Sequence, residues 1–230
     1  MRCRDQSAVN LYIAKATPNF EDRLVRAALP TTPEEKLVRM KRCRITQQRT
    51  CMALSEVLLV WALFESRGLE VRKSDRFVGE FGKPMLRISG ETVEFNISHS
   101  GSYALVGIDE NPVGVDIQQW GRSYDQIARK IMPLEEYGAW TESSDKVIAF
   151  CEFWTRKESM LKWRGVGIAG LRDADDLLPE SIGAYPVVAP QGYSAAACGY
   201  ISTSHPNALR AQEIEVEMLL AQVERRQEAL

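Results

Sequence analysis

The segment Val147–Gly167 constrains the fold most, because it is long, apolar on one side and carries a charge where a helix would bury it. At about 100° per residue, one face of a helix over this segment forms an apolar arc. That arc contains Val147, Phe150, Cys151, Trp154 and Leu161. Glu158 falls in the middle of the arc, and Lys162 lies one turn further on, at its edge. A buried carboxylate is unfavourable unless it is paired or binds a metal ion. The segment therefore predicts either a Glu158–Lys162 pair that reaches solvent or a polar site inside the protein.

A second acid lies within a predicted strand, in the segment Asn111–Trp120. Side chains alternate along a strand, so Val113, Val115 and Ile117 share one face and Gly114, Asp116 and Gln118 share the other. Asp116 is thus opposite a core-facing row. On this segment alone, the acid is equally compatible with the solvent face of an antiparallel strand.

A polar break separates two apolar strands in the segment Phe95–Ile108. Ser98, His99, Ser100 and Gly101 form this break, and they offer hydroxyls, an imidazole and backbone N–H groups to an anion. A simple hairpin loop with a surface histidine is the alternative interpretation. Upstream, the turn Glu80–Pro84 presents Lys83.

Each half of the chain shows a long helix followed by short strands, and SGSYALVGI in the first half is faintly similar to GYSAAACGYI in the second, which suggests two similar halves. We expect helices from about Thr31 to Arg67, where Gly68 would end them, between Tyr124 and Trp140, and over Asp145–Trp163. A frayed helix is expected at the C-terminus. The expected strands are Ala8–Ala14, Met85–Ile88, Thr92–Ile97, Tyr103–Asp109, Val113–Ile117, Pro186–Ala189, Ser194–Ile201 and Glu213–Glu217.

The composition excludes several classes of protein. Twenty-nine Lys and Arg against 31 Asp and Glu give a net charge of −2, which argues against a nucleic-acid partner bound through a broad basic surface. Two histidines cannot build a three-histidine zinc site, and five cysteines without a CxxC pair predict free thiols in a reducing cytoplasm. The longest apolar run, Val57–Phe64, is too short to span a bilayer, so no membrane partner is expected.

Three glycines have the GxGxxG spacing of dinucleotide-binding proteins: Gly165, Gly167 and Gly170. That fingerprint requires a strand before it and a helix after it, whereas a helix is predicted before it here. We therefore interpret these glycines as the end of that helix, and a dinucleotide-dependent oxidoreductase remains a weak alternative.

Four motifs, FGKP, FNISHSG, VGVDIQ and FWTRKESMLKWRGVG, occur in this order across Phe81–Gly167. Together they resemble the 4′-phosphopantetheinyl transferase superfamily in its longer, two-half form. The resemblance implies a monomeric pseudo-dimer of two α+β halves. Residues 1–110 would form the coenzyme A nucleotide side and residues 111–230 the metal and catalytic side. The implied reaction moves the 4′-phosphopantetheine arm of coenzyme A to a serine of an apo acyl or peptidyl carrier protein and releases 3′,5′-ADP.

The same resemblance implies the catalytic residues. Asp116 and Glu158 would bind Mg²⁺ or Mn²⁺, and Lys162 would face the pyrophosphate of coenzyme A. Glu158, or a metal-bound water, could accept the serine proton. Many members of the superfamily carry Glu where this chain has Gln118, whose amide would bind the metal weakly or through a water molecule. This loss of charge leaves open an alternative function, a catalytically weakened module that binds coenzyme A or a carrier protein.

The resemblance also implies which residues bind the two substrates. Coenzyme A would contact Ser98 and His99 through its 3′-phosphate and Lys157 through a phosphate. Lys83 would contact its phosphate or adenine side. Further basic candidates for the nucleotide are Lys41, Arg42, Arg44 and Arg49. The carrier protein would dock near residues 121–140. Candidate contacts there are Arg122, Arg129, Lys130, Ile127, Ile131 and Met132, although the same residues could simply pack a short helix onto the core. Which carrier is served is not fixed by these motifs.

Overall fold

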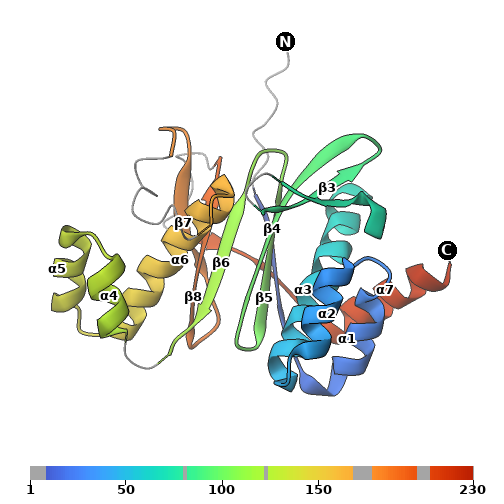
Figure 1. Cartoon of the computed structure of the whole chain (residues 1–230), viewed down its shortest axis with the longest axis horizontal. Helices are drawn as coiled ribbons and strands as arrows, with labels where there is room; N and C mark the ends of the chain where they lie inside the picture. The colour runs from blue at the N-terminus through green and yellow to red at the C-terminus, as the bar shows by residue number, and fades with distance from the viewer. Residues whose placement is uncertain (1–8, 80–81, 122–123, 168–177, 201–207, 230) are drawn as a thin grey trace, which may run out of the picture.

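In the computed structural model, the chain forms two sheets, with helices on the outer side of each (Figure 1). The structure describes residues 9–79, 82–121, 124–167, 178–200 and 208–229. The helices are α1 (Glu21–Ala28), α2 (Glu34–Arg42), α3 (Thr46–Arg67), α4 (Asp125–Ile131), α5 (Leu134–Glu142), α6 (Lys146–Arg164) and α7 (Val216–Glu228). Short 3₁₀ helices cover Pro18–Phe20 and Lys73–Asp75. The strands are β1 (Asn10–Lys15), β2 (Arg76–Val78), β3 (Pro84–Ile88), β4 (Glu91–Ser100), β5 (Tyr103–Asp109), β6 (Gly114–Gln119), β7 (Gly183–Val188), β8 (Tyr193–Gly199), β9 (Leu209–Arg210) and β10 (Gln212–Ile214).

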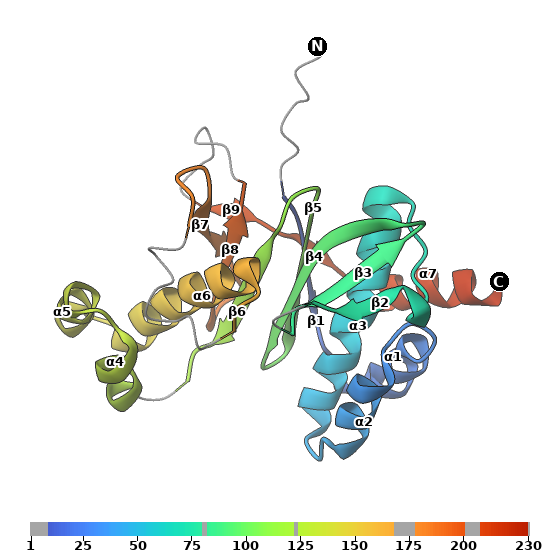
Figure 2. The ribbon, with the colours of Figure 1, turned by 45° about the horizontal axis from the view of Figure 1, so that its top comes forward.

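The first sheet has the strand order β10-β1-β5-β4-β3-β2 and packs against α3. Most of α3 is buried because its apolar residues surround the helix, as expected for a helix enclosed by a sheet and other helices. Gly68 ends α3 in the left-handed conformation, with φ of 65°, as the sequence predicts. Helices α1 and α2 both pack against α3 (Figure 2).

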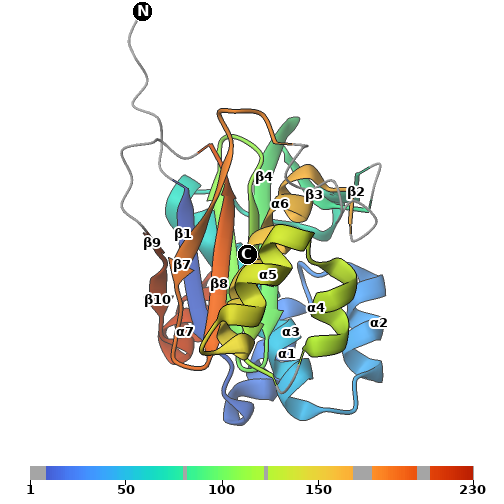
Figure 3. The same ribbon diagram turned by 90° about the vertical axis from the view of Figure 1, so that its left-hand side faces the viewer.

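The second sheet has the order β6-β8-β7-β9 and packs against α6. The Asp145 carboxylate caps α6 by accepting hydrogen bonds from the backbone N–H groups of Val147 and Ile148. Gly165 ends the helix with φ of 80°, which confirms that this glycine terminates a helix. Gly170, the third glycine of the GxGxxG spacing, lies outside the described residues. Helices α4 and α5 are outermost on this side of the molecule (Figure 3).

Strand β6 presents its two faces to different parts of the protein. Its apolar residues pack into a core between the two sheets, together with Leu11 and Ile13 of β1. Its other face, which carries Asp116, lies against α6. The alternation predicted for this segment is therefore confirmed, and the acid faces a helix rather than open solvent.

Side chains of β4 join the two sheets by binding the backbone of β6. Three alternate residues of the NISHS motif accept hydrogen bonds from three alternate backbone N–H groups. These bonds run from Val115 to Asn96 Oδ1 (2.9 Å), from Ile117 to Ser98 Oγ (3.3 Å) and from Gln119 to Ser100 Oγ (3.0 Å). The free edge of β6 is thus satisfied by side chains instead of another strand.

The end of the chain returns to the first sheet. Strand β10 pairs in parallel with β1, and α7 packs against α1 and α3. The strand predicted over Glu213–Glu217 is shorter than expected, because β10 ends at Ile214 and α7 begins at Val216. The α+β class is confirmed, and each sheet carries one long helix, which is compatible with two similar halves. Residues 212–228, however, pack with the N-terminal residues rather than with the rest of 111–230.

None of the helices in the described parts of the chain is both long enough and apolar enough to cross a membrane.

Candidate active site

The site forms where β6 and α6 approach each other most closely, at Gly114. A methyl group on Gly114 would overlap the Ser159 carbonyl oxygen and would lie 2.9 Å from Trp163 Cα. The backbones of strand and helix are therefore in direct contact, two residues before Asp116. This contact brings Asp116 beside Glu158 and Lys162, which lie one turn apart on α6.

Asp116 is buried, with 5% of its surface exposed. Its Oδ1 accepts hydrogen bonds from Ser98 Oγ at 2.7 Å and from Lys162 Nζ at 2.5 Å. Lys162 Nζ also donates to Ser98 Oγ at 3.0 Å, so the three side chains form a closed set. The second carboxylate oxygen, Oδ2, is buried without a hydrogen-bond partner in the described structure. A buried, unpaired carboxylate oxygen is a position that a cation would stabilise.

Glu158 supplies a second such oxygen. Its Oε1 is also buried and lacks a hydrogen-bond partner in the described part of the chain. Burial raises the pKa of Glu158, and the nearby charge of Asp116 raises it further, while Lys162 opposes the change. Two carboxylates that disfavour each other's charge fit a hard divalent cation held by oxygen ligands.

The donor set contains two carboxylates and no third acidic or histidine ligand. No cluster of three or more His, Cys, Asp or Glu side chains occurs within the described ranges. Gln118 lies on the same face of β6 as Asp116, but its Nε2 donates to the Gln119 carbonyl oxygen at 2.9 Å. The described residues therefore bring two carboxylates together and place an amide on the same face of β6.

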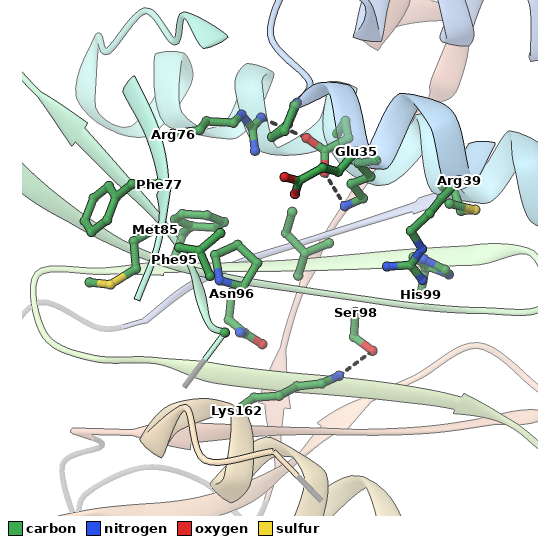
Figure 4. A pocket seen from close by; sticks show the side chains of 18 of the residues that line it. Glu35, Arg39, Arg76, Phe77, Met85, Phe95, Asn96, Ser98, His99 and Lys162 are labelled. Carbon is green, nitrogen blue, oxygen red and sulfur yellow. Dashed lines mark hydrogen bonds and ion pairs between the residues drawn. The ribbon is translucent and has the colours of Figure 1, made fainter. Parts of the chain in front are cut away.

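A cavity of about 730 Å³ opens beside this set, which is within the usual range for a cofactor site (Figure 4). Residues of α2, α3, β2, β3 and β4 line it, and Lys162 of α6 lies at one end. Its cationic lining residues are Lys36, Arg39, Arg76 and Lys162. Phe77, Met85 and Phe95 form an apolar part of the wall on the side away from Arg39 and His99 (Figure 4). Such a cavity can hold a ligand with both phosphates and a flat apolar group.

His99 lines the cavity and lies next to Arg39 (Figure 4). The ring is open to the cavity, yet the surrounding protein lowers the pKa of His99 to about 4. The largest cause is the displacement of bulk water by that protein, and the positive charges of Lys36, Lys162 and Arg39 add to it. An anion bound among these groups would reverse the effect.

Lys36, Arg39 and Arg76 are not among the residues that the motifs predict. Lys36 and Arg39 are one turn apart on α2, which is a visible signal, but the sequence does not show which side of α2 meets the sheet. Lys36 and Arg76 both pair with Glu56, which is buried in α3. Glu56 also lines the cavity, so a carboxylate within the wall holds two of the cations of that wall.

Several predicted coenzyme A contacts lie away from the cavity lining. Arg49 forms an ion pair with Glu21 and donates to the Cys43 carbonyl oxygen at 2.6 Å, so it ties α1 to the chain between α2 and α3. Arg44 is exposed, as are Lys41 and Arg42, and none of the three lines the cavity. The positions of these basic residues give no support to a contact with the nucleotide.

Lys157 and Lys83 are also held in other places. Lys157 is buried, with Nζ 3.5 Å from Glu136 Oε2, and does not line the cavity. Lys83 Nζ lies 3.7 Å from Glu94 Oε2 and donates to the Val113 and Trp163 carbonyl oxygens at 3.4 and 3.3 Å. Burial lowers the pKa of Lys83. This lysine fastens its turn to β6 and α6, and only its neighbours along the chain reach the cavity wall.

The segment predicted to dock a carrier protein forms α4 and α5. Ile127 and Leu134 are exposed, the latter at 90%, whereas Met132 is buried and Ile131 packs beside it in the core. Arg129 and Lys130 are exposed, and Arg122 lies outside the described residues. One apolar residue of the predicted set, Ile127, is thus available at the surface.

Comparisons with known proteins agree with the site. Residues 112–207 match the sequence profile of the 4′-phosphopantetheinyl transferase superfamily. The chain is 25% identical over 175 residues to a 4′-phosphopantetheinyl transferase of Bacillus subtilis, covering 75% of this chain and 76% of that protein. It is 30% identical over 133 residues to 4′-phosphopantetheinyl transferase Sfp of Bacillus subtilis strain 168, covering 56% of this chain and 59% of that protein. It is 36% identical over 92 residues to 4′-phosphopantetheinyl transferase gsp of Aneurinibacillus migulanus, covering 39% and 37%.

The profile match spans the strand of Asp116 and the helix of Glu158 and Lys162. Over residues 112–207, the chain is therefore similar to the 4′-phosphopantetheinyl transferase superfamily. It matches less than two thirds of the length of two of the three relatives.

Proposed function

We propose that this protein transfers the 4′-phosphopantetheine arm of coenzyme A to a serine hydroxyl of an apo carrier protein. The observation that carries the proposal is the convergence of Asp116, Glu158 and Lys162 beside a cavity whose lining contains four cations and three glutamates. The names of the relatives support the same reaction.

Coenzyme A would lie in the cavity with its phosphates toward the cations of α2 and β2. His99 and Arg39 are placed to contact a phosphate, and the flat apolar wall at Phe77 suits the base. The pyrophosphate would then reach Lys162, whose side chain is 26% exposed and points to Asp116. This orientation puts the bond to be broken next to the two carboxylates.

Asp116 and Glu158 would hold Mg²⁺ or Mn²⁺ through their unpaired buried oxygens. When bound, the metal would supply positive charge that offsets the charge of the pyrophosphate. Gln118→Glu would add a third carboxylate to the set, so titration calorimetry with Mg²⁺ alone should show tighter binding for this variant. Equal affinity of the variant and the wild type would remove Gln118 from the metal site.

The residues of the chain can carry the transfer. The serine oxygen attacks the phosphorus that bears the pantetheine arm, a new P–O bond forms, and the P–O bond to 3′,5′-ADP breaks. Glu158, with its raised pKa, would accept the serine proton. Lys162 would neutralise the charge that develops on the departing 3′,5′-ADP.

The carrier protein would dock on α4 and α5, next to α6. Ile127 and Leu134 offer apolar contacts, and Arg129 and Lys130 offer positive charge to the acidic surface of a carrier. Arg129→Glu together with Lys130→Glu should raise KM for the carrier and leave KM for coenzyme A unchanged.

Incubation with coenzyme A, Mg²⁺ and a panel of apo carrier proteins tests the function directly. Mass spectrometry should show a gain of about 340 Da on one serine, the mass of the transferred group. Glu158→Gln should abolish the gain, whereas Glu152→Gln, an exposed acid on the same helix, should not. No gain on any carrier would refute the transfer, and a full rate in Glu158→Gln would refute the site.

A further inference from the structure

We propose that Ser98 is a positioning residue that holds Asp116 and Lys162 in their reactive places, and that it does not contact the 3′-phosphate of coenzyme A. This inference rests on the proposed function and departs from what the family resemblance implies for Ser98. It leaves His99, the next residue, as the group on β4 that meets the phosphate.

The hydroxyl of Ser98 already uses its whole hydrogen-bonding capacity. A serine hydroxyl has one donor and two acceptor positions. Ser98 Oγ donates to Asp116 Oδ1 at 2.7 Å and accepts from Ile117 N at 3.3 Å and from Lys162 Nζ at 3.0 Å. Because phosphate oxygens only accept hydrogen bonds near neutral pH, Ser98 could contact a phosphate only by giving up its bond to Asp116.

The strand geometry separates the tasks of Ser98 and His99. Neighbouring side chains on a strand point to opposite sides. Ser98 is buried, and with Asn96 and Ser100 it belongs to the row that binds the backbone of β6. His99 points the other way and lies beside Arg39 in the cavity (Figure 4). Ser98 also lines the cavity, beside Lys162, but its hydroxyl is bound to Asp116 and to the β6 backbone, whereas the His99 ring lies beside Arg39.

The contact with Ile117 explains why Ser98 can position other groups. The backbone of β6 fixes the hydroxyl, and the fixed hydroxyl then orients one carboxylate oxygen and one ammonium group. Without it, Lys162 Nζ would keep Asp116 Oδ1, 2.5 Å away, as its remaining described partner, and the ammonium group would lose its second fixed contact. Small displacements of catalytic groups can lower a rate about 100-fold.

The test compares Ser98→Ala with Ser100→Ala, using coenzyme A and dephospho-coenzyme A, which lacks the 3′-phosphate. Ser100 also accepts a bond from the β6 backbone, but its partner is Gln119 N and not Asp116. For Ser98→Ala we expect kcat to fall about 10- to 100-fold, with the preference for coenzyme A over dephospho-coenzyme A kept. For Ser100→Ala we expect kcat within about threefold of the wild type.

Three results would overturn the inference. One is an unchanged kcat in Ser98→Ala. Another is a loss of the preference for the 3′-phosphate in that variant, since this would make Ser98 a phosphate contact. The third is an equal fall of kcat in both variants, which would indicate a general effect of the β4–β6 bonds. If Ser98→Ala fails to fold, Ser98→Thr keeps the hydroxyl and should keep both kcat and the preference, and a lost preference would again contradict the proposal.

A failure of the proposed function would give a different pattern. In that case the wild type would transfer nothing to any carrier, while calorimetry would still measure the affinities for coenzyme A and dephospho-coenzyme A. Ser98→Ala should keep the wild-type ratio of those affinities. A ratio reduced to one would refute the inference independently of transfer.

Discussion

Gly114 is the residue on which the geometry of the site depends most directly. Any side chain there would overlap the backbone of α6 at Ser159 and Trp163. We expect Gly114→Ala to lower the free energy of unfolding by about 3 kcal/mol, because overlap with backbone cannot be relieved by a rotamer change. The variant should also lose transfer activity, since α6 carries Glu158 and Lys162. Urea unfolding followed by circular dichroism measures the first effect.

Gly138 is the matched control for this substitution. It lies in α5, and a methyl group there would meet no atom within 4 Å. Gly138→Ala should stabilise the protein by about 0.5 kcal/mol or more, because alanine favours helix more than glycine does. Equal stability of the two variants would show that β6 and α6 do not touch at Gly114.

His99 should change its protonation when an anion binds. In the free protein its pKa is lowered to about 4, so the ring is neutral at pH 7. A phosphate next to the ring favours the charged form and raises the pKa of His99. Between the pKa of the free protein and that of the complex, binding takes up a proton, so the affinity for 3′,5′-ADP should rise as the pH falls through the pKa of the complex toward about 4.

NMR titration of the imidazole protons, with and without 3′,5′-ADP, checks this prediction. The chain has two histidines, so His205→Gln assigns the signal of His99. The pKa of His99 should be higher in the complex. The same pKa in both states would place the phosphate elsewhere in the cavity.

At the scale of elements, the α2–α3–β2 wall depends on one buried charge. Glu56 in α3 is 1% exposed and pairs with Lys36 and with Arg76, whose Nη2 lies 2.8 Å from Glu56 Oε2. Removing one partner of a buried ion pair leaves the other charge uncompensated. We expect Glu56→Gln to lower the free energy of unfolding by about 3 kcal/mol in urea titrations.

Glu65 provides the comparison on the same helix. It is 40% exposed and pairs with Arg226 at the surface. Glu65→Gln should change the free energy of unfolding by about 1 kcal/mol or less, because exposed pairs contribute little. If Glu56→Gln changed the free energy of unfolding as little as Glu65→Gln, the ion pairs of Glu56 would not be what holds Lys36 and Arg76 in place.

The sequence predicts the long helices and their ends better than it predicts their partners. Gly68 and Gly165 are recognisable because a left-handed end favours glycine. Asp116 and Glu158 are recognisable because each is an acid on an otherwise apolar element. Lys162 is recognisable because it lies one helical turn after Glu158. By contrast, the sequence suggests Arg49 and Lys157 as phosphate contacts, but in the structure they pair with Glu21 and Glu136. Both partners are distant in the sequence. Local periodicity carries no information about such pairs.

At the scale of the whole molecule, the site lies between two sheets that the chain connects twice. It passes from β5 to β6 beside the site, and it returns at the end, where β10 pairs with β1. A division of the chain at residue 110 agrees with the motifs, but it does not account for β10 and α7, which pack with the first sheet and its helices. The core between the sheets contains residues of both, including Leu11 of β1 and Val115 of β6. The two halves should therefore unfold together.

Helix α7 allows a test of this coupling far from the site. Leu219 is fully buried against the first half, whereas the adjacent Met218 is 38% exposed. Leu219→Ala should lower the free energy of unfolding by about 2–5 kcal/mol, because it leaves a cavity. Met218→Ala should change it by about 0.5 kcal/mol or less.

Calorimetry should show one transition for the wild type and one for Leu219→Ala at lower temperature. Hydrogen exchange in β8 should accelerate in that variant as well, since β8 belongs to the second sheet. A split transition, with β8 protected as in the wild type, would show that the halves are independent domains and that the last helix stabilises only one of them.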